Sequence, residues 1–323
     1  MRSASQRAAS AGRLKRAVVT ARCNAFFHMA DPMVPISWNK PFTIPSGTDH
    51  LRSVRRAFPP LEGDAQVPES FCSGRDWGDV AHEYREQGFA VVRQLLSPAE
   101  LAHLRSSVDD YIRDVVPNKD SSHVFTPEPG ELSTLQYFSD PHEQQYLASY
   151  GGQPKWRYLA ACCLGEPFLQ EDPTRSHVVQ GPSIQFFNKV PGDKSLHTPA
   201  HQDNYYFKLA PPNCLTVWMA LDEVDIGNGV LHYVPRSHRE GLLPHSPSHV
   251  LGFSQSLIGW EGSPQQAREI SPGRLSPGDV VIHHCNTIHR ADANRSADRH
   301  RRSVALVFSG QSAVPTSTSK VVT

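Results

Sequence analysis

The sequence predicts a mainly β domain with flanking helices, arranged as a sandwich or barrel. Beyond residue 178 the chain carries short runs of β-branched and aromatic residues. Turn residues such as Pro191-Gly192 and Gly227-Asn228-Gly229 separate these runs. Several short strands divided by regular turns are typical of sandwiches and barrels. The expected strands cover residues 183–190, 203–208, 215–221, 230–235, 279–284 and 303–309.

An opening strand and a capped helix are expected before this strand-rich half. Residues 88–92 combine a glycine with β-type residues and predict a strand. Ser97, Pro98 and Glu100 supply an N-cap, a proline at the first helical position and a capping-box carboxylate. Apolar residues follow at helical spacing, so this helix is expected to reach Val116. A second helical stretch is expected over residues 141–163.

Composition divides the chain into terminal segments and one domain. Residues 1–30 contain five Arg, one Lys and no acidic residue. Such a segment is typical of a disordered start or of an organelle-targeting peptide. The alternative is that translation begins at Met29. Residues 31–77 are rich in Pro and Gly and predict an extended arm or linker. The domain is expected over residues 78–311, with a lid-like insert at 240–276 and a flexible tail at 312–323.

Charge and cysteine usage narrow the classes of function. The 323 residues include 32 basic and 32 acidic side chains, so the formal net charge is zero, which argues against nucleic acid as a partner. No apolar run approaches the ~20 residues of a membrane span, so no membrane partner is expected. The six cysteines show no Cys-x-x-Cys spacing, which favours a reduced, intracellular protein. We expect a cytoplasmic location, with the mitochondrion as the alternative, and a small-molecule substrate.

Histidine is the unusual component, with 17 residues, and it prompts a search for metal ligands. The pattern His-x-Asp/Glu occurs at His201/Asp203 and at His238/Glu240, a number that chance alone explains. The first pair enters a predicted strand, where residues i and i+2 share a face and can grip one ion. The second pair lies in a predicted turn that fixes no common face. The sequence therefore favours His201 and Asp203 as ligands.

A third ligand has to come from a distant part of the chain. Two histidines and one carboxylate form the facial triad of non-haem Fe(II) oxygenases, which leaves coordination positions open. The segment 279–289 offers His283, His284 and His289. Periodicity does not choose among these three histidines, each of which is also compatible with a structural role.

Ordered motifs extend this pattern beyond one tripeptide. They are Pro199–Asp203, Trp218–Asp222, Asn228–Leu231, Val234–His238, Pro277–Val281, Ile288–Arg290 and Asn294–Ser296. Together they resemble the phytanoyl-CoA dioxygenase family, over residues 80–310. The resemblance implies a double-stranded β-helix, which is a cupin-like jelly roll. It also implies that the protein binds Fe(II) and uses 2-oxoglutarate and O2 as co-substrates.

The resemblance assigns residues to this expected site. It makes His201, Asp203 and His289 the iron ligands. It places Gln185 and Trp218 in the 2-oxoglutarate pocket. The other two histidines of the 279–289 segment are then expected to support the site or the fold.

In this resemblance, the arginine that holds the distal carboxylate of 2-oxoglutarate matches Arg301. The loop before it is longer than is usual in the family, so Arg302 is the alternative. Adjacent residues of a strand face opposite sides, so one of the two points into the barrel. Arg301 shares its face with the small Ser303 and Ala305, whereas Arg302 shares its face with large apolar residues. The sequence favours Arg301 as the residue that binds the carboxylate.

The implied reaction is oxidation of a small organic substrate, most simply hydroxylation of a C–H bond, with release of succinate and CO2. Related halogenating enzymes lack the carboxylate ligand, so the presence of Asp203 predicts an oxidative outcome other than halogenation. Tyr205, Phe253 and Gln255 are expected to border the substrate pocket. The alternative is a non-oxygenase or catalytically silent jelly roll that binds a metal.

Overall fold

The computed structural model describes residues 76–119, 124–126, 132, 134–135, 150–168, 178–192, 197–250 and 252–316. The segment predicted over residues 1–30 lies outside these residues, as does all but the end of the arm predicted over 31–77. The same holds for the tail beyond residue 316 and for the first part of the helix predicted over 141–163.

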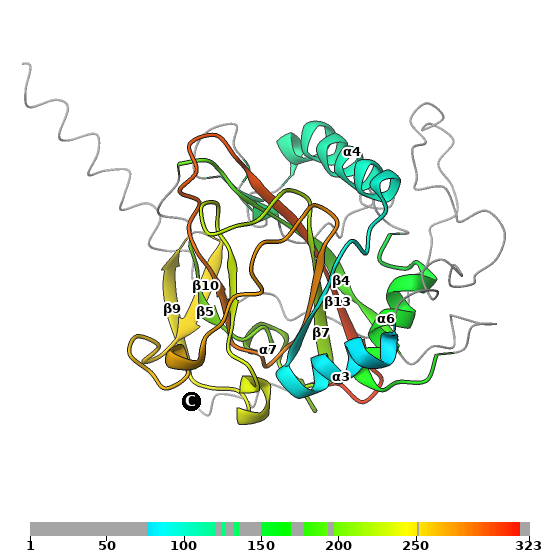
Figure 1. Ribbon diagram of the computed structural model, residues 1–323, viewed down its shortest axis with the longest axis vertical. Helices are drawn as coiled ribbons and strands as arrows, with labels where there is room; N and C mark the ends of the chain where they lie inside the picture. Colours follow the sequence, from blue (N-terminus) through cyan, green and yellow to red (C-terminus); the bar gives the residue numbers. More distant parts are fainter. Residues whose placement is uncertain are drawn as a thin grey trace, which may run out of the picture. The chain divides into compact units, whose positions relative to one another are not determined.

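A seven-stranded antiparallel sheet forms the framework (Figure 1). Its order is β1-β11-β7-β13-β4-β3-β2, with β13 paired on one side to β7 and on the other to β4. The strands are β1 (Phe89–Val92), β2 (Val124–Phe125), β3 (Thr134–Leu135), β4 (Val178–Lys189), β7 (Cys214–Ala220), β11 (Val280–His284) and β13 (Arg301–Gly310).

A smaller sheet lies against the inner face of the first. It has the order β5-β12-β8, formed by β5 (Thr198–His201), β12 (His289–Ala291) and β8 (Leu231–Tyr233). Inward-facing residues of both sheets, such as Ala305 and Trp218 from one and Leu231 from the other, form a common buried cluster. Two facing antiparallel sheets confirm the predicted mainly β jelly roll.

Helices cover the outer face of the large sheet (Figure 1). They are α3 (Trp77–Gln87), α4 (Pro98–Asp114) and α6 (Pro154–Leu164). Strand alternation explains the packing, because Val217 and Met219 of β7 join Leu104 of α4 in the main core while Trp218 faces the barrel interior. Ser97 and Glu100 form the predicted capping box at the start of α4, by reciprocal hydrogen bonds of 3.2 and 2.9 Å.

The strand predicted over residues 203–208 is wrong. Asp203 has helical dihedral angles, and Asn204–Phe207 form the short helix α7. The Asn204 side chain binds both the backbone N–H and the carbonyl of Leu209, and this local bonding outweighs the β preference of the aromatic run. His201 and Asp203 therefore meet at a strand-to-helix turn.

The sequence did not predict the short strands β2, β3, β5 and β12, nor three further features. Helix α3 is one, and it begins after the side chain of Asp76 caps it. Another is a hairpin of β9 (His245–Val250) and β10 (Phe253–Leu257) within the insert 240–276. The third pairs β14 (Val314–Pro315), in the predicted flexible tail, with β6 (Leu209–Ala210).

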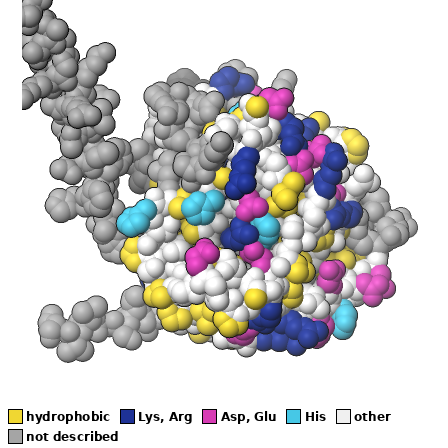
Figure 2. Space-filling view, turned by 60° about the vertical axis from the view of Figure 1, so that its left-hand side comes forward, with side chains coloured by type: hydrophobic (Ala, Val, Ile, Leu, Met, Phe, Trp, Pro, Cys, Tyr) yellow, Lys and Arg dark blue, Asp and Glu magenta, His cyan; other side chains and the backbone are white. Residues whose placement is uncertain are grey.

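The surface of the described residues mixes both signs of charge. Lys and Arg side chains are interspersed with Asp and Glu over the face drawn in Figure 2. This distribution matches the equal numbers of basic and acidic residues in the sequence. None of the helices in the described part of the chain is both long and apolar enough to span a bilayer.

Candidate active site

Two histidines meet across neighbouring strands of the small sheet. His201 ends β5 and lies opposite His289, which begins β12, with 4.2 Å between the ring centroids. The Nδ1 atoms lie 2.8 Å from the Pro199 carbonyl and 3.0 Å from the Thr287 carbonyl, respectively. Carbonyl oxygens accept only, so each Nδ1 carries the proton and each Nε2 keeps its lone pair for a metal.

Asp203 completes a three-residue donor set. One of its oxygens, Oδ1, lies 3.5 Å from His201 Nε2 and 3.6 Å from His289 Nε2. Ligand atoms from the three residues all lie within 4.8 Å of one another. Two imidazole nitrogens and one carboxylate oxygen in this arrangement fit a non-haem Fe(II) ion and leave part of its coordination sphere open.

Electrostatics favours the protonation state that metal binding requires. Burial alone would raise the pKa of Asp203, but the neighbouring His289, His201 and His283 side chains hold it well below its usual range. Burial, reinforced by the neighbouring His201 and His283, lowers the pKa of His289 well below its usual range. An ionised carboxylate and neutral imidazoles are the forms that bind a metal ion.

The donor set opens onto one pocket. Gln185, Trp218, Phe253 and Arg301, all expected near the site, line this pocket together with the three metal-ligand candidates. Much of the remaining lining is apolar. These residues include Phe187, Leu231, Ala291 and Ala305.

Arg301 lies inside the barrel and is 3% exposed. Its Nη1 donates to Ser303 Oγ at 3.0 Å, and its guanidinium carbon lies 5.6 Å from the centre of the Trp218 ring. Burial lowers the pKa of Arg301 to about 10, so the side chain stays charged at neutral pH. Its buried Nε has no hydrogen-bond partner among the described residues. A buried, charged guanidinium with an unused N–H donor fits the distal carboxylate of 2-oxoglutarate.

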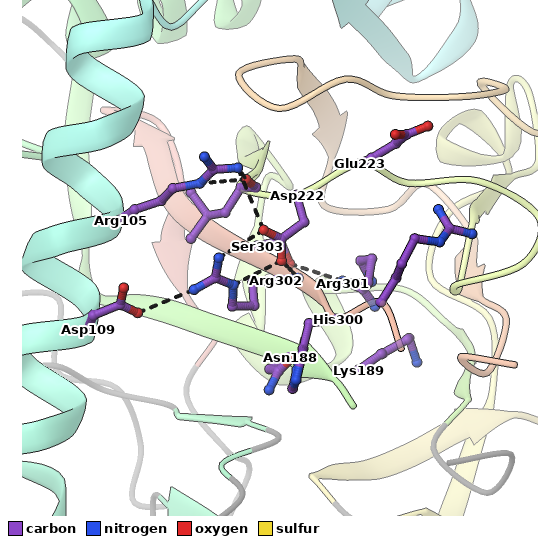
Figure 3. Close-up of polar contacts among 12 residues, drawn as sticks. Arg105, Asp109, Asn188, Lys189, Asp222, Glu223, His300, Arg301, Arg302 and Ser303 are labelled. Carbon is purple, nitrogen blue, oxygen red and sulfur yellow. Dashed lines mark hydrogen bonds and ion pairs between the residues drawn. The ribbon is translucent and has the colours of Figure 1, made fainter. Parts of the chain in front are cut away.

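Arg302 points to the opposite face of β13 (Figure 3). Its Nε and Nη2 both donate to the carboxylate of Asp222 at 2.9 Å, and its Nη1 reaches Asp109 of α4 at 3.3 Å. Arg105 of α4 donates to the Leu221 carbonyl at 2.8 Å. These contacts give Arg302 a structural role in joining α4 to the sheet.

Not every expected pocket residue reaches the pocket. The ring of Tyr205 stacks on His245 at 4.4 Å, and Tyr205 is not among the lining residues. Gln255 is also outside the lining, and its backbone hydrogen-bonds the Tyr206 hydroxyl. Phe253 does line the pocket, with its ring 6.2 Å from that of His201.

Sequence reasoning missed Lys189, which is 5% exposed and lines the pocket. Its stem passes over Gly229, where a Cβ would come within 2.7 Å of Lys189 Cδ. Gly229 also has a φ of 104°, a conformation that favours glycine. The only sequence signal was the Asn228-Gly229 pair, which the sequence marks simply as a turn.

Sequence reasoning also gave no role to Thr216. Its Oγ1 donates to Asp203 Oδ2 at 2.7 Å. A signal was available, because Thr216 lies two residues before Trp218 and so shares its inward-facing side of β7. His283, left open by the sequence, lies 3.1 Å from the same Asp203 oxygen.

The fold and this donor set define a jelly-roll protein with a candidate metal site of two histidines and one carboxylate. The sequence model of the phytanoyl-CoA dioxygenase (PhyH) family matches residues 84–303, and the chain belongs to this family. A similar relative is the bovine protein named "Phytanoyl-CoA dioxygenase, peroxisomal", 26% identical over 229 residues. That match covers 66% of this chain and 63% of the bovine protein, less than two thirds of its length. The phytanoyl-CoA dioxygenase of Arabidopsis thaliana is 22% identical over 70% of this chain and 87% of its own.

Solved structures share the fold at low sequence identity. The carbocyclase SnoK from nogalamycin biosynthesis has a TM-score of 0.56 and 22% identity, covering 75% of this chain and 87% of its own. EctD from S. alaskensis, solved with 2-oxoglutarate and 5-hydroxyectoine, has a TM-score of 0.55 and 18% identity. It covers 80% of this chain and 81% of its own.

Proposed function

We propose that this chain is an Fe(II)- and 2-oxoglutarate-dependent dioxygenase that hydroxylates a C–H bond of a small organic substrate, with release of succinate and CO2. One observation carries the proposal. The donor set of His201, Asp203 and His289 shares a single pocket with the buried guanidinium of Arg301. A metal site and a carboxylate-binding group in one pocket are what 2-oxoglutarate requires.

The chain's own residues hold the co-substrate in this proposal. Arg301 pairs with the distal carboxylate of 2-oxoglutarate, while Ser303 fixes one arm of the guanidinium. Trp218 packs beside the guanidinium and limits its movement. Iron and 2-oxoglutarate, when bound, supply the oxidative chemistry, in which O2 converts 2-oxoglutarate to succinate and CO2 and oxidises the substrate.

The pocket walls position the substrate and exclude water. Phe187 and Phe253 stack with 6.1 Å between ring centroids and form an apolar wall close to His201. Phe253 begins β10, so the hairpin in the insert 240–276 supplies one side of the pocket. An apolar, water-poor pocket favours C–H oxidation of a bound substrate over side reactions.

The proposed substrate class is broad. The bovine relative is named for phytanoyl-CoA, whereas SnoK is described as a carbocyclase and SnoN as an epimerase. The fold therefore does not fix the substrate, and we propose a small organic molecule. Asp203 stands at the carboxylate position of the donor set, which supports hydroxylation over halogenation.

Turnover tests this proposal. Purified protein supplied with Fe(II), O2 and 2-oxoglutarate should form succinate, and one compound of a metabolite panel should raise the rate. Asp203→Ala is the matched negative control, because it removes a ligand candidate. If the protein binds neither iron nor 2-oxoglutarate, it is a non-oxygenase jelly roll.

The cellular location is proposed from composition alone. We propose the cytoplasm, with the mitochondrion as the alternative because residues 1–30 are basic. The bovine relative is named as peroxisomal. Imaging of a tagged full-length chain decides among the three compartments.

A further inference from the structure

The carboxylate of Asp203 has two distinct sides. Oδ1 faces the Nε2 atoms of His201 and His289. Oδ2 faces away from them, accepts a hydrogen bond from Thr216 Oγ1 at 2.7 Å, and lies 3.1 Å from His283 Nε2. One oxygen is therefore free for a metal while two side chains already occupy the other.

His283 is held rigidly in this position. It belongs to β11, where it pairs with Phe89 of β1 and with Thr216 of β7, and it is 2% exposed. Both donors to Asp203 Oδ2 thus come from paired positions on neighbouring strands of the large sheet. Asp203 itself lies in a turn before α7 and lacks the support of a strand.

A hydrogen-bond chain fixes the tautomer of His283. A carboxylate oxygen accepts only, so the His283 Nε2 that faces Asp203 carries the proton. The His283 Nδ1 is then an acceptor, and the Tyr233 hydroxyl donates to it at 3.3 Å. Tyr233 is fully buried and stacks on Phe89 with 4.6 Å between ring centroids, which holds the phenol in place.

We propose that His283, oriented by Tyr233, is a positioning residue that makes Asp203 a one-oxygen metal ligand. This inference rests on the proposed function. With two imidazoles and one oxygen as its protein ligands, a bound ion would keep positions open for 2-oxoglutarate and O2. A carboxylate free to rotate would bind through both oxygens and close one of these positions. Hydrogen bonds from neighbouring residues to a metal-ligating side chain commonly set metal affinity in this way.

The test is metal binding to the purified full-length chain, with Co(II) as a spectroscopic substitute for Fe(II). His283→Phe keeps an aromatic ring but removes both hydrogen bonds, and we expect it to raise the Co(II) dissociation constant by roughly 10- to 100-fold. Tyr233→Phe should produce a smaller increase. His283→Gln places an N–H close to the former Nε2 and should restore most of the affinity. The visible Co(II) spectrum should change in His283→Phe and return in His283→Gln.

His284→Asn is the matched control, because His284 is adjacent in sequence and its Nδ1 accepts from the backbone of Asn286 and not from Asp203. Its affinity for Co(II) should equal that of the unaltered chain. Equal affinity in His283→Phe would overturn the proposal. A loss in His283→Phe that His283→Gln does not restore would also overturn it, because the imidazole would then act as a ligand itself.

Two further outcomes remain decisive. If His283→Phe does not fold, His283→Asn replaces it, because Asn is too short to reach Asp203. It should then bind Co(II) more weakly than His283→Gln, and equal binding by the two overturns the proposal. If the unaltered chain binds no Co(II), the proposed function fails and this inference fails with it. If the unaltered chain binds Co(II) and only the variant series departs from expectation, the proposed function stands.

Discussion

Removing the Arg301 guanidinium should weaken 2-oxoglutarate binding steeply and leave metal binding intact. Arg301 is 3% exposed, and its Nε lacks a partner among the described residues. Arg301→Ala would therefore leave the distal carboxylate of 2-oxoglutarate buried and unpaired. The loss of one such contact costs about 2–5 kcal/mol, or between about 30-fold and a few thousand-fold in affinity. Metal affinity should persist, because Arg301 is not one of the three ligand candidates.

The assay is an anaerobic titration of the Fe(II)-loaded protein with 2-oxoglutarate. Arg302→Ala is the matched control, because Arg302 binds Asp222 and Asp109 on the outer face of the sheet. It should lower the thermal midpoint and leave 2-oxoglutarate affinity unchanged. Arg301→Lys should recover only part of the affinity, because an ammonium group lacks the planar fork. Loss of 2-oxoglutarate binding in Arg302→Ala, with binding retained in Arg301→Ala, would refute the assignment of Arg301.

Three other changes have defined outcomes. Asp203→Ala should lose Fe(II) binding and succinate formation. The unaltered enzyme should give no chlorinated product by mass spectrometry, and chlorinated product would contradict the assignment of Asp203. Phe253→Ala should raise the KM for the substrate more than the KM for 2-oxoglutarate, because Phe253 forms the apolar wall near His201; the reverse ranking would remove Phe253 from the substrate side. Burial, with smaller contributions from His238 and His283, lowers the pKa of His284 to about 3. The folded state therefore keeps His284 neutral, whereas the unfolded state protonates it near pH 6.5. Stability should therefore fall as the pH drops below 6.5, and His284→Asn should remove about 3 kcal/mol of that fall by pH 4.5 in urea denaturation. Parallel pH profiles for the two proteins would contradict this.

Local sequence patterns were sufficient to predict where several helices and strands lie along the chain. The capping box at Ser97 and Glu100 predicted the start of α4, and short runs of β-type residues between turns predicted strands close to β7, β11 and β13. The short helix α7 was missed because its aromatic run favours a strand. Side-chain bonds of Asn204 to Leu209 decide its conformation, and a sequence pattern does not reveal them.

The candidate site depends on contacts between distant strands. Periodicity left His283, His284 and His289 equivalent, because all three are separated from Asp203 by about 80 residues of intervening chain. The pairing of β12 with β5 brings His289 to His201, and the pairing of β11 with β7 brings His283 to Thr216. Strand register of this kind is non-local, so family resemblance was needed to select His289.

The most direct test of the central claim is the binding stoichiometry of the purified chain under anaerobic conditions. One Fe(II) should bind per chain, followed by one 2-oxoglutarate that binds tightly only after the metal is present. His201→Ala and His289→Ala should each lose the metal and, with it, the tight binding of 2-oxoglutarate. A chain that binds no Fe(II), or that binds 2-oxoglutarate equally well with and without the metal, would contradict the account.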